Sequence, residues 1–122
     1  MDRIQVLIVD DHVMVRKSIH MFLNTDPSVQ VTGEARDVQD AVRQARSLLP
    51  TVVLMDLMLA QGDSCQAIVE IKSYLPSIKI IVLTMSEDKT RVEAALAAGA
   101  DSYLAKSVAD GEALLKAIHA FQ

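Results

Sequence analysis

The chain has 122 residues, the usual size of one domain with its own hydrophobic core. Hydrophobic residues make up 51% of it and charged residues 23%, which excludes intrinsic disorder. A net charge of −4 and an aromatic content of 3% disfavour direct binding of nucleic acid or of an anionic membrane surface.

The cysteine content and the hydrophobic segments indicate a cytoplasmic protein. Cys65 is the only cysteine, so neither an intrachain disulfide nor a cysteine-based zinc site can form. The first residues lack the pattern of a signal peptide. No stretch of about 20 apolar residues is present that would span a membrane.

The N-terminal half of the chain twice pairs a strand pattern with a helix pattern. Ile4–Val9 predicts a strand that is buried on both faces. Apolar residues at helical spacing then predict a helix over about Val13–Leu23. Val29–Glu34 predicts a weaker strand, and Asp37 is suited to cap a helix that carries apolar residues over Val38–Leu49.

The next strand–helix pair has a polar residue at a critical place. Thr51–Met55 predicts a buried strand that runs straight into Asp56. A loop with Gly62 and Asp63 follows, and the apolar spacing over Ala67–Leu75 predicts a helix.

The last third of the chain continues the alternation. Lys79–Leu83 predicts a strand, and Ser86 is suited to cap a helix around Val92–Leu96. Asp101–Leu104 predicts a short strand, and a helix is expected to open at Asp110. Five strands therefore alternate with five helices, which is typical of an α/β fold with a parallel sheet and helices on both faces.

Polar residues follow four of the five predicted strands. These residues are Asp10-Asp11, Asp56, Thr84 and Lys106. Because the carboxyl ends of parallel strands meet at one edge of the sheet, we expect these side chains to lie together. Three neighbouring carboxylates repel one another unless a cation lies among them, and Mg²⁺ prefers such oxygen ligands. Lys106 is suited to bind a phosphoryl group as a point charge.

The order of these residues resembles the response-regulator receiver domain of two-component signalling, over the whole chain. The resemblance implies a flavodoxin-like, doubly wound sheet with the strand order 2-1-3-4-5 and a single receiver domain over residues 1–122. Four local runs are similar to the NarL/FixJ subgroup, which usually carries a LuxR-type helix-turn-helix after the receiver: Val9–His12, Met55–Leu57, Leu83–Ser86 and Gly99–Lys106.

The resemblance also implies the chemistry of the site. Asp56 accepts a phosphoryl group from a histidine kinase. Asp10, Asp11 and Asp56 hold Mg²⁺, with help from the backbone carbonyl of Met58. Lys106 contacts the phosphoryl oxygens. The domain is then a phosphoacceptor module rather than a classical enzyme.

The expected output is a change of surface that follows phosphorylation. The resemblance implies that Thr84 and Tyr103 form the switch pair and remodel the face made by Val92–Leu96, Tyr103 and Leu114–Phe121. This face is expected to control a homodimer or an attached DNA-binding effector domain, which is absent from this chain. DNA is then a partner only through that missing domain, and no membrane partner is expected.

Several positions depart from the family pattern. Ala60 stands where proline is usual, and Ser64 where glycine is usual, so Gly62 is expected to take over a turn. Met85 replaces a small residue beside the switch threonine. Ser107 replaces a proline. The Lys106–Ser107 peptide bond is therefore expected to be trans, because a cis bond before a residue other than proline costs about 3 kcal/mol.

Two other functions fit parts of the pattern. One is an aspartyl-phosphate phosphatase. Such enzymes usually need a second acid two residues after the nucleophile, and Met58 stands there, which argues against this function. The other is a receiver-like interaction module that is never phosphorylated. The altered loop after Asp56 agrees with it. The intact set of polar residues after the strands argues against it: Asp10, Asp11, Asp56, Thr84 and Lys106.

Isolated basic and histidine side chains are interpreted as surface residues. The histidines lack metal-ligand spacing and are assigned to the surface or its boundary: His12, His20 and His119. Two basic pairs are predicted to face solvent: Arg16-Lys17, and Arg43 with Arg46.

Overall fold

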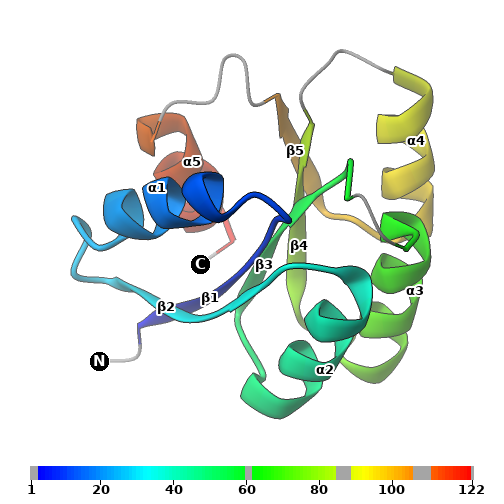
Figure 1. Cartoon of the computed structure of the whole chain (residues 1–122), viewed down its shortest axis with the longest axis horizontal. Helices are drawn as coiled ribbons and strands as arrows, with labels where there is room; N and C mark the ends of the chain where they lie inside the picture. The colour runs from blue at the N-terminus through cyan, green and yellow to red at the C-terminus, as the bar shows by residue number, and fades with distance from the viewer. Residues whose placement is uncertain (1–2, 60–61, 85–88, 106–110, 122) are drawn as a thin grey trace.

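The computed structural model describes residues 3–59, 62–84, 89–105 and 111–121. Within these residues, one parallel sheet has the strand order β2-β1-β3-β4-β5, as predicted (Figure 1). Its strands are β1 (Ile4–Val9), β2 (Val29–Ala35), β3 (Val52–Asp56), β4 (Lys79–Thr84) and β5 (Ser102–Ala105).

Helices cover both faces of the sheet. They are α1 (Val13–Leu23), α2 (Val38–Leu48), α3 (Ser64–Tyr74), α4 (Lys89–Ala98) and α5 (Gly111–His119). Figure 1 shows α1 and α5 on one face and α2, α3 and α4 on the other. None of these helices is long and apolar enough to cross a bilayer. The predicted caps Ser86 and Asp110 lie outside the described residues.

The hydrophobic core consists of two layers that share the central strands. Val6 and Ile8 of β1 pack in the layer under α1 and α5, whereas Leu7 and Val9 pack in the layer under α2, α3 and α4. Because both faces of β1 are covered, its sequence is a continuous apolar run rather than an alternating one. The same reason explains the runs that predicted β3 and β4.

Two aspartates begin helices. The Asp37 carboxylate accepts a hydrogen bond from the Asp40 amide at 2.8 Å, as expected for the start of α2. Asp63, which the sequence placed only in a loop, caps α3 by accepting from the amides of Cys65 and Gln66 at 2.9 and 3.4 Å. These caps satisfy amides that the first helical turn leaves without partners.

The end of α5 is tied to the turn between α1 and β2. His119 Nε2 lies 2.7 Å from Asp26 Oδ2, and Asp26 Oδ1 accepts from the amide and the hydroxyl of Ser28 at 2.9 and 2.6 Å. The hydrogen bond with His119, followed by those from Ser28, lowers the pKa of Asp26 to about 2.

This tie predicts a pH dependence of stability. The pKa of Asp26 is lower in the folded protein than its ordinary value of 3.8. Ionised Asp26 therefore stabilises the folded protein above pH 3.8, and this stabilisation is lost as the pH falls towards 2. Urea unfolding between pH 5 and pH 2.5 should therefore show a shallower acid loss in Asp26→Asn than in wild type. His119→Gln is expected to flatten the curve less, because the two hydrogen bonds from Ser28 to Asp26 remain. Identical acid slopes in all three proteins would contradict this prediction.

Candidate functional site

Three carboxylates meet at the carboxyl edge of the sheet. Asp10 and Asp11 follow β1, and Asp56 ends β3, which pairs directly with β1. One ligand atom from each of Asp10, Asp11, His12 and Asp56 can be chosen so that all four lie within 4.8 Å of one another. Asp10 is fully buried and Asp56 is 2% exposed. The strand order brings these acids together as the sequence indicated.

The backbone orients two of these carboxylates. Asp10 Oδ1 accepts a hydrogen bond from the His12 amide at 2.9 Å, and Asp56 Oδ1 accepts from the Met58 amide at 3.0 Å. In both cases the amide lies two residues after the aspartate, which is the pattern of an Asx turn. Each strand therefore ends in a turn that fixes its acid in place.

His12 is a member of the cluster that the sequence did not indicate. Its side chain is 67% exposed, yet Nδ1 lies 3.2 Å from Asp10 Oδ1 and 2.9 Å from Asp11 Oδ1. A lone histidine without metal-ligand spacing gives little signal. Its position directly after two acids at a strand end was the available indication.

The donor set fits a hard divalent cation. Asp10, Asp11 and Asp56 offer carboxylate oxygens, the ligands that Mg²⁺ takes alongside several waters. The cluster holds three carboxylates and one imidazole, so the oxygen ligands dominate. A softer metal is favoured by nitrogen- or sulfur-rich sites.

The predicted switch residues lie on neighbouring strands. Thr84 ends β4 and is 2% exposed, whereas Tyr103 in β5 is 50% exposed. A hollow of about 430 Å³ lies beside them, lined by Thr84, Tyr103 and Ala105 and by Lys89, Val92, Glu93 and Leu96 of α4. Lys106 lies outside the described residues.

The loop after Asp56 contacts a second residue that the sequence did not indicate. Arg91 on α4 donates a hydrogen bond from Nη1 to Met58 Sδ at 2.9 Å. The Met58 side chain is exposed, in the loop that follows Asp56. This contact joins that loop to α4.

The loop after Asp56 is closed by a buried hydroxyl. Ser64, which stands where the family usually has glycine, donates from Oγ to the carbonyls of Asp56 and Leu57 at 3.2 and 3.4 Å. Gly62 has a φ of +91°, which favours glycine, so it takes the turn as expected. The other departures from the family pattern lie outside the described residues: Ala60, Met85 and Ser107.

Removing this hydroxyl should destabilise the domain. Ser64→Ala leaves buried carbonyls with one donor fewer, so we expect the free energy of unfolding to fall by about 1 kcal/mol. Ser73→Ala is the matched control, because the Ser73 hydroxyl also donates to a carbonyl, that of Glu70, but at an exposed position. Urea unfolding would contradict the prediction if both variants lost the same stability.

The assignment of Arg16 to a solvated face is wrong. Its side chain is only 14% exposed, and Nη1 donates to the backbone carbonyl of Asp10 at 2.6 Å. Nε donates to Glu34 Oε1 at 3.2 Å, and His20 Nδ1 lies 2.9 Å from Glu34 Oε2. The His20 hydrogen bond, with Arg16, lowers the pKa of Glu34. The contact depends on β2 lying beside β1, which helical spacing within α1 does not reveal.

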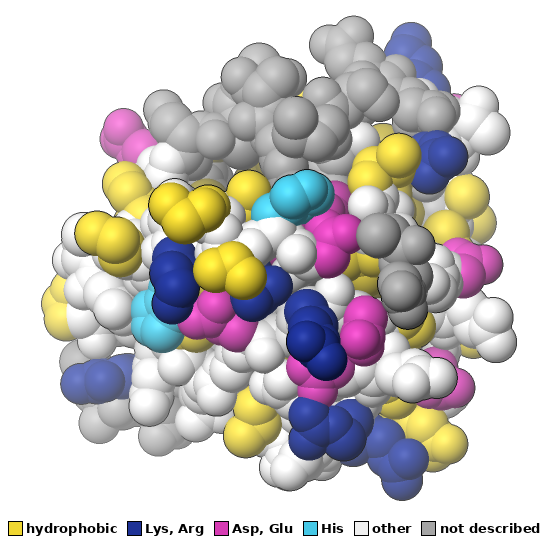
Figure 2. Space-filling model, in the orientation of Figure 1, with side chains coloured by type: hydrophobic (Ala, Val, Ile, Leu, Met, Phe, Trp, Pro, Cys, Tyr) yellow, Lys and Arg dark blue, Asp and Glu magenta, His cyan; other side chains and the backbone are white. Residues whose placement is uncertain are grey.

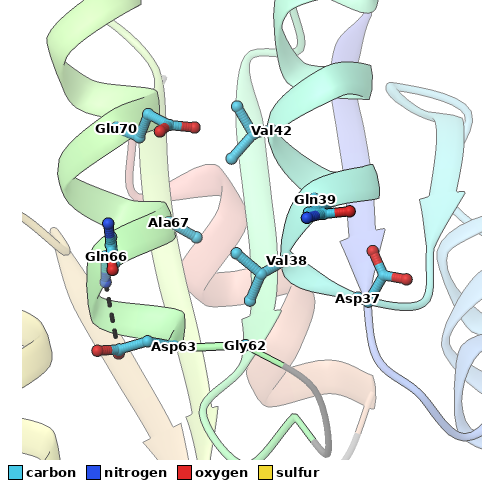
Figure 3. A pocket seen from close by; sticks show the side chains of 9 residues that line it. All are labelled: Asp37, Val38, Gln39, Val42, Gly62, Asp63, Gln66, Ala67 and Glu70. Atoms are coloured by element: carbon cyan, nitrogen blue, oxygen red, sulfur yellow. Dashed lines mark hydrogen bonds between the residues drawn. The ribbon is translucent and has the colours of Figure 1, made fainter.

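A groove of about 390 Å³ lies away from this site, between α2 and α3 (Figure 3). Its wall includes Val38, Val42 and Ala67, with Glu70 on the α3 side. Two of its carboxylates, Asp37 and Asp63, are the helix caps described above. None of the three acids Asp10, Asp11 and Asp56 lines this groove.

Comparison with known proteins agrees with this geometry. The sequence pattern of the response regulator receiver domain matches residues 6–119. This chain belongs to that family. Among its curated relatives is the response regulator protein VraR of Staphylococcus epidermidis, which is 42% identical over 104 residues. That alignment covers 85% of this receiver domain and 50% of VraR, so the chain spans about half the length of the curated relatives it matches.

Solved structures include several close neighbours of the receiver domain. A LuxR-family two-component response regulator from Aurantimonas has a TM-score of 0.90 and 30% identity, with 98% of this chain and 84% of that chain covered. RcsB from Salmonella enterica serovar Typhimurium, bound to the promoter rprA in the presence of the phosphomimetic BeF3⁻, has a TM-score of 0.87 and 31% identity. That match covers 99% of this chain and 61% of RcsB.

Proposed function

We propose that this receiver domain accepts a phosphoryl group on Asp56 and passes the signal to an output domain. The observation that carries the proposal is the cluster of Asp10, Asp11 and Asp56 at the carboxyl edge of the sheet. Asp56 is the acid that ends the central strand β3, with two further acids beside it. The family match to a receiver domain supports the same chemistry.

The reaction moves one phosphoryl group from a donor to a carboxylate. An Asp56 oxygen attacks phosphorus, a new O–P bond forms, and the bond between phosphorus and the donor's leaving group breaks. Such a transfer needs positioning and charge neutralisation more than covalent help. The Met58 amide donates a hydrogen bond to Asp56 Oδ1 and holds the nucleophile in one orientation.

The other acids would hold Mg²⁺ together with Asp56 and the Met58 carbonyl. When bound, the ion neutralises charge on the phosphoryl oxygens and between the carboxylates. Lys106 is assigned to the same oxygens as a second positive charge. We assign a histidine kinase as the phosphoryl donor, because the chain belongs to the response regulator receiver family.

The output is a two-state change around Thr84 and Tyr103. A phosphoryl group at Asp56 adds negative charge and strong acceptor oxygens near the end of β4. A Thr84 hydroxyl drawn towards it would vacate space beside the hollow next to Tyr103. The exposed Tyr103 ring can then move inward and remodel the surface of α4, β5 and α5.

This surface would control dimerisation or an attached DNA-binding domain. The relatives support that assignment, because RcsB is a response regulator seen on promoter DNA and the Aurantimonas protein is of the LuxR family. Exposed hydrophobic side chains also lie over α1, where Figure 2 shows them beside basic ones. The exposed hydrophobic residues of α1 are Val13, Met14, Met21 and Phe22.

The direct test is intact-mass measurement. Incubation with acetyl phosphate and Mg²⁺ should add the mass of one phosphoryl group (net HPO₃), and excess EDTA should prevent it. The absence of any Mg²⁺-dependent mass shift would overturn the proposed function and leave an interaction module that is never phosphorylated.

The switch is tested by a threonine variant. Thr84→Ala should accept phosphate but fail to couple it to a change of assembly, because the buried hydroxyl at the end of β4 is gone. Thr90→Ala, on the exposed side of α4, is the matched control. Sedimentation with and without beryllofluoride should shift for wild type and Thr90→Ala only. Equal shifts in all three proteins would mean that the switch uses another group.

A further inference from the structure

An arginine side chain that is only 14% exposed links the backbone of the acidic site to β2. Arg16 on α1 donates to the Asp10 carbonyl at 2.6 Å and to Glu34 Oε1 at 3.2 Å. Glu34 on β2 is itself contacted by His20 Nδ1 at 2.9 Å. These contacts form one chain from α1 through β2 to the backbone of the acidic cluster.

Every polar group of Asp10 in this turn has a defined partner. Its amide donates to the Ala35 carbonyl at 3.0 Å, and its carboxylate accepts from the His12 amide at 2.9 Å. Its carbonyl accepts from Arg16. Because a peptide unit is planar, fixing the Asp10 carbonyl also fixes the direction in which the backbone enters Asp11.

We propose that Arg16, held by Glu34, is a positioning residue for the metal site of this domain. Its guanidinium fixes the peptide between Asp10 and Asp11 and so keeps the two carboxylates at the spacing a divalent cation needs. The inference rests on the proposed function for the metal ion itself, and it adds a residue outside the acidic cluster.

A purely electrostatic role and a positioning role of Arg16 predict opposite changes in Mg²⁺ affinity when its side chain is removed. A cation near the site repels Mg²⁺, so its removal would by electrostatics alone tighten metal binding. Removal of a positioning group instead lets the carboxylates separate and weakens metal binding. The sign of the change in Mg²⁺ affinity therefore separates the two roles.

The shape of the side chain matters as well as its charge. Arg16 uses two different nitrogens, Nε for Glu34 and Nη1 for Asp10, so the planar fork spans both partners. A lysine has a single ammonium group and cannot reproduce that fork. Arg16→Lys keeps the charge and should still bind Mg²⁺ more weakly than wild type.

The experiment measures Mg²⁺ affinity of the metal-free domain by isothermal titration calorimetry or by ¹⁵N NMR shifts. Arg16→Gln should raise the dissociation constant about tenfold. Arg43→Gln is the matched control, because Arg43 also pairs with a carboxylate, that of Asp40, but on the exposed face of α2. The Mg²⁺ affinity of Arg43→Gln should equal that of wild type.

Two further measurements separate positioning from loss of fold. Glu34→Gln retains an acceptor but loses the charge that holds Arg16, so a smaller weakening, about threefold, is expected while the ¹⁵N spectrum stays dispersed. With acetyl phosphate, Arg16→Gln should need more Mg²⁺ for half-maximal labelling but reach the same rate at saturation. A lower saturated rate with unchanged Mg²⁺ dependence would overturn the assignment.

The outcomes distinguish this inference from the proposed function. Wild type that binds no Mg²⁺ would overturn both. Wild type that binds Mg²⁺ beside an Arg16→Gln variant of equal or tighter affinity would overturn only the positioning role of Arg16.

Discussion

Asp56→Asn is expected to abolish phosphoryl labelling by acetyl phosphate in the presence of Mg²⁺. The amide retains an oxygen that can accept from the Met58 amide, so the turn after β3 should be preserved. An amide oxygen is a much poorer nucleophile than a carboxylate, and the product would carry no stable acyl phosphate. Loss of the mass shift would therefore report chemistry rather than unfolding.

The matched control is Glu70→Gln, which removes an exposed carboxylate on α3 in the groove between α2 and α3 (Figure 3). It should be labelled as fast as wild type. Peptide mapping of the labelled wild type should place the phosphate on Asp56. Labelling of Asp56→Asn at the wild-type rate, or mapping to Asp10 or Asp11, would contradict the assignment of the acceptor.

Asp11→Asn should change metal affinity and metal-free stability in opposite directions. Mg²⁺ affinity should fall by about 10- to 100-fold, because one charged ligand becomes neutral. The metal-free domain should become more stable, because two unit charges within 4.8 Å repel by about 3 kcal/mol at an effective dielectric constant of about 20. The variant also removes the negative charge that His12 Nδ1 contacts at 2.9 Å, so the net gain expected is about 1–2 kcal/mol.

Urea unfolding in EDTA and in excess Mg²⁺ measures both effects. The advantage of Asp11→Asn in EDTA should shrink as NaCl is added, because salt screens repulsion at this partly exposed position. In saturating Mg²⁺ the order should reverse, since the wild type gains more from binding the ion. Glu70→Gln should stay within about 0.5 kcal/mol of wild type throughout. A metal-free Asp11→Asn that is less stable than wild type would show that the carboxylates do not repel as the geometry predicts.

Local sequence patterns determined the elements and their order. Apolar runs and helical spacing predicted β1 and α1 with the observed bounds, because these patterns depend on neighbours within one element. The same alternation placed the acids at one edge of the sheet, since parallel strands end together. Asp10, Asp11 and Asp56 could therefore be selected before any side-chain geometry was known.

Tertiary structure decided which distant side chains meet, at the acidic site and elsewhere. Arg16 looks like a solvated residue within its helix, yet β2 brings Glu34 beside it, and its guanidinium donates to both Glu34 and the Asp10 carbonyl. His119 and Asp26 are 93 residues apart and meet only because α5 packs beside α1. Such pairs leave no periodic signal, because their free energy arises from contacts that exist only after the layers have packed. The sequence alone therefore determined the elements and the reactive acids, and only the packed structure decided how those acids are held.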